Sequence, residues 1–550
     1  MAAHENHIPL ASSMASTTAS PSPTLLQRLA VVLPKDVSFK IHHLSTPPTK
    51  SPSIFSAPPG ARPERTYCES HFLTASINVP VADNGTEFAD VLVYAIEILL
   101  YSTAYNTTFF VSKADSTGFL HLLNLPKGTS SPLKHISATF LEHLVAQHRR
   151  PNIRNVISLF ARAQDQYLFP GSVEYSGKHV LDDGGLIRWW CRVLDPLITG
   201  SNASKGYGNI EGYLIVPGLD SYETSSYFPR KPVAGGSPWT MGHPLYEISR
   251  HSNNIPPRAL IPHFPDDPKA RYLDELDEEI TKEQTESSGQ WKSVKTIEQF
   301  WDMMAFRQEC SAGRRVGFIW VVFNPQPTEN LETSTVAFRG VGRTPSDSSS
   351  RTYPITPSGS FSAPTEQQSL DLSPPPLSPA KDTPKLAPKR RTTPKRKKLT
   401  GPIITRQPKS KTGTKNYFLK IPESTAYYYW PSSGRGQVVV QETDYKRINE
   451  LLLRLDFANI ELALSSSKRW TNEVRSGAPW NMKEAWGQIV TGTKAKEDSI
   501  MSGSAGANTL SVGLVRKKRK VDDVPPVVAE QVVNVIGPGV IRKKPKVLEA

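Results

Sequence analysis

The sequence predicts an α/β domain, and two kinds of pattern predict it. Short β-branched or aromatic runs bounded by Gly, Pro or Asn are typical of strands. They are interspersed with segments in which apolar residues recur at spacings of three and four, which is the period of a helix. These patterns extend from Thr66 to about Phe323. Strands interspersed with helices over such a length favour an α/β fold.

Each element is assigned from its own residues. A helical period at 24–33 indicates the start of the fold. Strands are expected at 72–79, 109–113, 212–216 and 316–323. Helices are expected at 88–101, 133–148, 155–163, 184–197 and 297–308.

Composition divides the chain further. Residues 1–22 are rich in Ser, Thr, Ala and Pro, and 325–435 form a Pro/Ser-rich basic insertion; both are expected to be disordered because they bury too little apolar surface. A helix within 436–465 is too apolar to remain in water, so it is expected to dock back and complete the domain begun by 24–324. Residues 490–550 are expected to form a disordered basic tail.

The formal net charge of +14 is concentrated outside the predicted domain. Residues 381–420 hold 14 basic and one acidic residue, and 511–550 hold nine basic and four acidic, so +13 and +5 leave −4 for the remainder. Basic clusters at 388–398, 516–521 and 542–547 resemble nuclear-import signals, the interpretation favoured for at least one; non-specific DNA contact and a solvated tail are the alternatives.

Several classes of protein lack support in the sequence. Three cysteines without a CxxC pair predict neither a disulfide framework nor a Cys-rich zinc site, and the histidines are scattered, so no metal centre is expected. The most apolar run, 91–101, is too short to span a bilayer and contains Glu97, which favours a soluble intracellular protein. The motifs of P-loop hydrolases, α/β-hydrolases, zinc proteases and dinucleotide-binding folds are missing.

The segment 261–271, IPHFPDDPKAR, carries the strongest chemical signal. Two prolines bracket Asp266 and Asp267, and Lys269 and Arg271 follow within one turn, which holds opposite charges close together. Asp267 before Pro268 is also a good helix start. Capping alone explains neither the doubled Asp nor Pro265, so a functional role is favoured beside it.

Two further segments join this one. FVSKAD at 110–115 ends a strand in an acidic residue, and the helix at 184–197 carries Trp189 and Trp190 side by side. Adjacent helical positions point about 100° apart, so the two indoles cannot face the same core. Either one of them lines a cleft, or both pack against neighbouring elements.

Together these stretches resemble the fungal histone H3 acetyltransferase family of the regulator-of-Ty1-transposition type, which modifies lysine fifty-six of H3. QYLFP (166–170), GKHVL (177–181), PGLD (217–220) and WTMGHP (239–244) also match, so the resemblance spans about 24–324 and 436–465. It implies a mixed central β-sheet wrapped by helices, like that of the p300/CBP acetyltransferases. It also implies a nuclear enzyme that uses acetyl-CoA on H3–H4 in chromatin assembly, DNA replication and the damage response. The H3–H4 substrate would be presented by chaperones of the anti-silencing-function and nucleosome-assembly-protein types.

The resemblance also assigns roles to individual residues. It implies that Asp267 is the acid/base residue, that Trp190 and Tyr167 line the channel for the incoming lysine, and that Lys269 is autoacetylated. For Asp266 only a positioning role is inferred. The residues expected to contact acetyl-CoA are Ala114, Asp115, Arg162, Ala163, Gln166, Lys178, His179, Trp190 and Arg271.

Elementary chemistry agrees with these roles. Acetyl transfer needs a neutral amine, whereas lysine has an ordinary pKa of about 10.4. Asp267 would accept the proton, and the apolar Trp190 would disfavour the charged amine. Either the Tyr167 hydroxyl or backbone N–H groups would stabilise the oxyanion. A non-catalytic scaffold that binds histone chaperones, with DNA-binding basic tails, is the competing hypothesis.

Overall fold

The structure is a computed structural model that describes residues 23–81, 87–200, 206–229, 237–251, 255–282, 289–307, 310, 314–326, 421–478, 483 and 485–495. The chain divides into two units, 1–496 and 497–550, and all described residues belong to the first. The expectations for 1–22, for most of the basic insertion and for the basic tail therefore lie largely outside the described residues.

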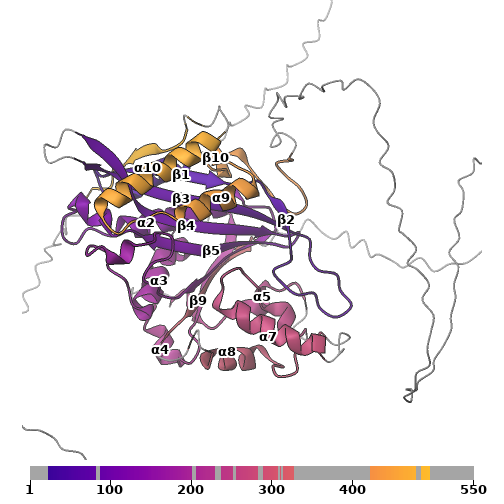
Figure 1. Cartoon of the computed structure of the whole chain (residues 1–550). Coiled ribbons are helices and arrows are strands. Elements are labelled where there is room, and N and C mark those ends of the chain that lie inside the picture. The colour runs from indigo at the N-terminus through magenta and orange to yellow at the C-terminus, as the bar shows by residue number, and fades with distance from the viewer. Residues whose placement is uncertain are drawn as a thin grey trace, which may run out of the picture. The chain divides into compact units, whose positions relative to one another are not determined.

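A mixed sheet forms the centre of the first unit, in the order β10-β1-β3-β4-β5-β6-β9-β7-β8, with β11 paired to β1 and β2 to β3 (Figure 1). Three pairs are parallel, namely β1 with β10, β5 with β6 and β7 with β8, and the others are antiparallel. The strands are β1 (Ser38–Ser45), β2 (Thr49–Ser51), β3 (Thr66–Pro80), β4 (Phe88–Ser102), β5 (Asn106–Ser116), β6 (Arg154–Ala161), β7 (Tyr207–Ile215), β8 (Trp239–Met241), β9 (Gly317–Pro325), β10 (Val438–Val439) and β11 (Gln488–Thr491).

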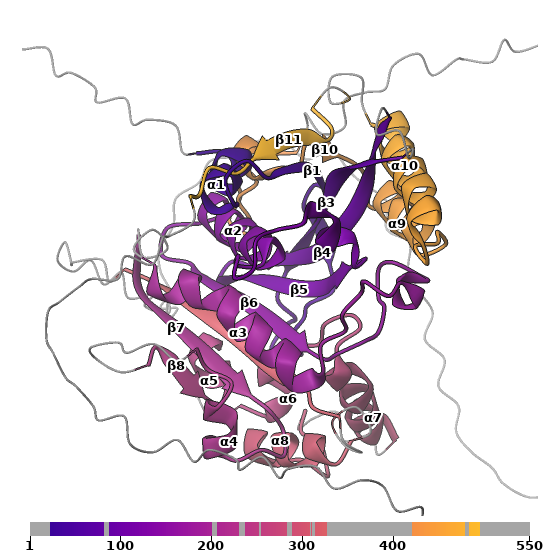
Figure 2. The ribbon, with the colours of Figure 1, turned by 90° about the vertical axis from the view of Figure 1, so that its left-hand side faces the viewer.

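Helices cover both faces of this sheet, as Figure 2 shows for α2 and α10. Tyr94 on β4 bonds through its hydroxyl to Ser137 on α2, whereas Glu97, three residues further, accepts a hydrogen bond from Tyr445 on α9. The helices are α1 (Leu25–Val32), α2 (Pro132–Gln147), α3 (Asp183–Thr199), α4 (Ser221–Ser225), α5 (Leu245–Ile248), α6 (Pro257–Leu260), α7 (Pro268–Lys282), α8 (Ile297–Ala305), α9 (Glu442–Leu452) and α10 (Ile460–Gly477), with short 3-10 turns η1 (Phe119–Leu123), η2 (Ser172–Glu174) and η4 (Ser432–Gly434).

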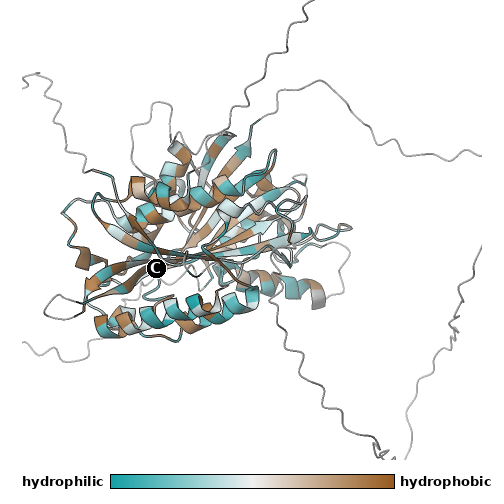
Figure 3. Ribbon diagram, turned by 90° about the horizontal axis from the view of Figure 1, so that it is seen from above, coloured by the Kyte–Doolittle hydropathy of each residue, from teal (hydrophilic) through white to brown (hydrophobic). Residues whose placement is uncertain are grey.

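Two expected helices are strands, and the prediction was wrong for both. The segment 88–101 is β4, and 155–163 corresponds to β6. Both strands are buried on both faces, so their apolar residues do not alternate with polar ones and the strand period of two is hidden. In the hydropathy colouring of Figure 3, polar and apolar residues are mixed along strands as well as along the outer helices.

The C-terminal part of the fold is longer than the sequence indicated. The described residues resume at Ile421, and the expected helix at 445–464 is divided into α9 and α10, the second ending at Gly477. β11 then pairs with Ser38–Ile41 of β1, so the chain adds to the sheet again after 465. Among the described residues no helix has the length and apolar character that a membrane crossing requires.

Candidate active site

A cleft of about 420 Å³ lies at the carboxyl ends of the parallel strands β5 and β6, beside the first turns of α3. Ligands of α/β folds commonly bind at this edge because loops leave the sheet there. The lining residues are Tyr94, 111–116, Ser131, Leu133, Leu159, Phe160, 162–164, Tyr167, 178–181, Leu186, Trp189 and Trp190.

Asp115 organises one wall of the cleft. One of its carboxylate oxygens accepts hydrogen bonds from the backbone N–H groups of Tyr167, Leu168 and Phe169, at 2.8, 2.9 and 3.3 Å. The other lies 3.0 Å from Nζ of Lys178. Both charged side chains are nearly buried, at 8% and 5% exposure, so this ion pair fixes the loop that carries Tyr167.

The opposite wall is built on α3. Trp189 and Trp190 both line the cleft, with their rings 4.8 Å apart in a T-shaped arrangement. Trp190 is buried and also belongs to the main hydrophobic core. Trp189 is partly buried and packs against the same core, so the expectation that the two indoles cannot face one core was wrong. Both alternatives apply, since each indole lines the cleft and also packs on the core.

Arg162 lies on the loop between these walls. The neighbouring Ala163 donates its backbone N–H to Asp183 on α3 at 2.9 Å, which positions the loop. Nε of Arg162 is buried and has no hydrogen-bond partner among the described residues. A buried guanidinium N–H beside a cleft has its hydrogen-bonding capacity available to an anionic ligand.

Lys113, which lines the cleft, forms two ion pairs that were not predicted from the sequence. Nζ of Lys113 lies 3.3 Å from Glu97 and 3.3 Å from Asp266, and it is 5.9 Å from the centre of the Tyr167 ring. Burial opposes the charge of Lys113, but Glu97 and Asp266 outweigh it and raise the pKa of the ammonium. The available signal was Glu97 itself, an acidic residue within an apolar run.

Glu97 also links these ion pairs to the part of the domain that follows the long insertion. Glu97 accepts hydrogen bonds from Tyr445 at 2.8 Å and from Asn449 at 3.2 Å, both on α9. The floor of the cleft is therefore connected to a helix that follows the long insertion in sequence.

The 261–271 segment runs alongside the cleft, where Phe264 stacks on Phe110 of β5 at 4.1 Å. Asp266 has φ +56°, a left-handed conformation that Asp tolerates better than most residues. Asp267 precedes Pro268, the first residue of α7, and its carboxylate accepts the backbone N–H of Lys269 at 2.9 Å, so capping holds as expected. The Asp267 carboxylate also forms an ion pair with Nζ of Lys269, and both side chains are buried.

The structure brings most of the predicted residues together. Those that line the cleft are Ala114, Asp115, Arg162, Ala163, Tyr167, Lys178, His179 and Trp190. Gln166, Asp266, Asp267 and Lys269 are outside this lining. Arg271 is also outside it, with its side chain 69% exposed and its Nε 3.4 Å from Glu275 on the next turn of α7.

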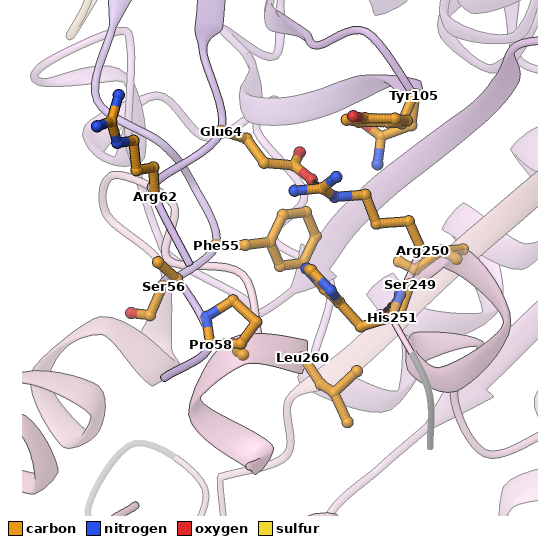
Figure 4. Close-up of a pocket in the computed structure, with 14 residues that line it drawn as sticks. Phe55, Ser56, Pro58, Arg62, Glu64, Tyr105, Ser249, Arg250, His251 and Leu260 are labelled. Atoms are coloured by element: carbon orange, nitrogen blue, oxygen red, sulfur yellow. Dashed lines mark hydrogen bonds and ion pairs between the residues drawn. The ribbon is translucent and has the colours of Figure 1, made fainter. Parts of the chain in front are cut away.

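A second hollow, between the 52–65 loop and α5, has a different character (Figure 4). Arg250 forms an ion pair with Glu64 there and lies 4.2 Å from the ring centre of Tyr105. The volume of this hollow, about 30 Å³, corresponds to a single water molecule. This hollow is a packed junction and offers no space for a cofactor.

The class of this protein follows from its sequence family. The chain matches the histone acetyltransferase KAT11-type domain over residues 25–155 and 149–473, so it is an acetyltransferase. It is 41% identical to histone acetyltransferase rtt109 of Aspergillus flavus, over 90% of this chain and 88% of that protein. The rtt109 protein of Schizosaccharomyces pombe is 36% identical over 42% of this chain and 57% of its own length. The crystal structure of Rtt109 from Aspergillus fumigatus has a TM-score of 0.61 and 37% identity, covering 86% of this chain and all of that one.

The chain therefore belongs to the fungal Rtt109 family of histone acetyltransferases. The predicted family, the mixed sheet with helices and the enzymatic class are confirmed, and the scaffold hypothesis loses its support. An acetyltransferase of this class takes its acetyl group from acetyl-CoA and acts on histones, which gives it a role in nuclear chromatin.

Proposed function

We propose that the cleft binds acetyl-CoA and that the enzyme transfers its acetyl group to lysines of histone H3 in H3–H4. Core lysine fifty-six is the first acceptor, and H3 tail lysines are further ones. The observation that carries the proposal is Nε of Arg162, which is buried beside the cleft and has no hydrogen-bond partner in the described part of the chain. Coenzyme A carries phosphates, for which an arginine fork is the preferred partner, while Trp189 and Trp190 supply apolar contact.

The acceptor lysine must lose a proton before it attacks the thioester. We infer that Asp267 accepts that proton and that the aromatic rings of Trp190 and Tyr167, which line the cleft, disfavour the charged amine. The ion pair between Asp267 and Lys269 occupies this carboxylate. Acetylation of Lys269 within the enzyme would remove the ammonium and leave the carboxylate available.

Tyr167 is suited to donate a hydrogen bond to the developing oxyanion. Burial, the largest influence, raises the pKa of its hydroxyl although Lys113 lowers it, so the phenol keeps its proton at physiological pH. The Tyr167 hydroxyl is therefore our candidate in preference to a backbone N–H. Asp266 positions Lys113 and, through it, this ring. Arg271 would reach acetyl-CoA only by leaving Glu275.

The choice of acceptor lysine is tested by reacting the purified full chain with H3–H4 and mapping acetylated residues by mass spectrometry. Chaperones of the anti-silencing-function and nucleosome-assembly-protein types are added separately, because we propose that each presents H3–H4 differently. Lysine fifty-six is expected to dominate with the first chaperone, with more tail acetylation with the second. An H3 pattern without lysine fifty-six under every condition would contradict the proposal.

The role of Arg162 is tested by the Arg162→Gln variant, which is expected to raise KM for acetyl-CoA about 10- to 100-fold, since a hydrogen bond to a charged group contributes about 1.5–3 kcal/mol. KM for H3–H4 is expected to stay near that of the unaltered chain. Arg188→Gln, an exposed position on α3 outside the cleft lining, is the matched control. Equal effects of both substitutions would remove Arg162 from the acetyl-CoA site.

A further inference from the structure

A buried cluster of histidines and one glutamate lies at the end of α2 opposite the cleft. Oε1 of Glu69 on β3 lies 2.8 Å from Nε2 of His71 and 3.3 Å from Nε2 of His148, which follows α2. The side chains are 5%, 0% and 3% exposed, and the three atoms lie within 4.8 Å of one another. Three potential metal ligands therefore converge on one point away from solvent.

Hydrogen bonds account for only part of this cluster, because His148 reaches Glu69 but Nε2 of His71 is left over. Nε2 of His71 has no hydrogen bond of acceptable geometry among the described residues, although it closely approaches Glu69. Nδ1 of His148 lies 3.0 Å from the carbonyl oxygen of Leu144, which can only accept, so this nitrogen carries a proton. In a neutral His148, Nε2 then directs a lone pair at a carboxylate oxygen, an arrangement that needs a cation or a further proton between them.

The outer nitrogens are held as they are in metal sites. His148 uses Nδ1 on the Leu144 carbonyl, and Nδ1 of His71 lies 3.0 Å from Nε2 of the buried His43. Second partners of this kind fix the tautomer and the orientation of the ring, so that Nε2 faces the metal.

We propose that Glu69, His71 and His148 bind one Zn²⁺ ion. Ligand atoms at about 2.0–2.1 Å from tetrahedral zinc lie roughly 3.3 Å apart. The Glu69 oxygen lies 2.8 and 3.3 Å from the two Nε2 atoms, and all three ligand atoms lie within 4.8 Å of one another. Two imidazoles and one carboxylate favour zinc over Mg²⁺ or Ca²⁺, which prefer oxygen ligands throughout. A water molecule would complete the coordination.

The site is closed by the segment that returns after the long insertion. A Cβ on Gly434 would lie 2.8 Å from Cε1 of His148, so glycine is needed for the backbone to approach the ring. The zinc ion would connect β3, through Glu69 and His71, to the end of α2, through His148, next to this segment. We therefore assign it a structural role, separate from acetyl transfer.

Sequence spacing conceals these ligands. Glu69 and His71 are two apart on one strand and share a face, which is also common in strands that bind nothing. His148 comes from a distant helix end, so none of the usual zinc motifs is formed.

The test measures metal in the full chain after removal of any affinity tag. Elemental analysis is expected to give about one zinc per chain, and after removal of zinc, Co²⁺ is expected to give a visible absorption band from bound ligands. His148→Gln should abolish both signals, and His43→Gln should weaken Zn²⁺ binding about 10- to 100-fold, as for other second partners.

His42→Gln is the matched control, because His42 is equally buried on β1 but lies against Trp486 and Thr74. It should retain zinc. Less than about one zinc per ten chains in the unaltered protein, with no cobalt band on titration with Co²⁺, would overturn the site whether or not the variants fold. Equal loss in His42→Gln would show that the signal reflects general destabilisation and would also overturn the assignment.

Discussion

Asp267→Asn is expected to lower kcat for acetylation of H3–H4 by roughly 10²- to 10⁴-fold, the usual contribution of a general base. The amide cannot accept the proton of the incoming lysine. The substitution also leaves the Lys269 ammonium buried without its counter-ion, which costs about 3–5 kcal/mol in comparable cases. Activity and stability must therefore be measured together, by steady-state kinetics and urea unfolding.

The double variant Asp267→Asn with Lys269→Met separates the two effects. Removing the cation as well as the anion is expected to restore most of the free energy of unfolding, since no buried charge remains unpaired. If Asp267 is the base, the double variant stays inactive although it is folded. Recovery of activity would show that the carboxylate only neutralises Lys269. Asp274→Asn, on the exposed side of α7, controls for general loss of charge.

The ion pair between Glu97 and Lys113 is a part of the site that could not be predicted from the sequence. A β-bulge between Glu97 and Ile98 shifts the register of β4 against β5, and Glu97 there meets Lys113 across the strands. Bulges of this kind reorient side chains without a fixed sequence signature. The proline-bracketed aspartates were recognisable because their unusual local chemistry is contained in a few consecutive residues.

The fold class was predictable because most elements carry their signal within consecutive residues. The central strands β4 and β6 do not, and they were expected to be helices. α3 and α8 show one apolar face each, so the helical period survives in the sequence. β4 carries Tyr94 toward α2 and Glu97 toward α9, so nearly every residue along it is buried. For such a run, periodicity does not distinguish a buried strand from a helix.

The composition of the sequence also obscured where the domain ends on the C-terminal side. Most residues in the second half of α10, RWTNEVRSG, are polar or charged, and they obscure Trp470 and Val474, both fully buried. A domain ending at 465 would omit both residues and also β11.

Trp470→Ala is consequently expected to lower the free energy of unfolding by about 3–5 kcal/mol, as for other buried tryptophans. The indole lies against Phe72 of β3 and Trp486, with ring centres 5.9 and 6.0 Å apart, and Nε1 donates to the Ile448 carbonyl at 3.3 Å. Substitution therefore leaves a cavity and removes a bond to α9. Because domains are stable by only about 5–15 kcal/mol, the loss should be plain in urea unfolding.

The matched control for Trp470→Ala is Leu462→Ala, a half-exposed position on the same helix, which is expected to change stability by about 0.5 kcal/mol or less. α9 carries Tyr445 and Asn449, the partners of Glu97, so loosening α10 also loosens the support of Lys113 beneath the cleft. Trp470→Ala should thus lower kcat under conditions in which the protein remains folded, whereas Leu462→Ala should not. Unchanged stability in Trp470→Ala would mean that the domain does not depend on the chain beyond 465.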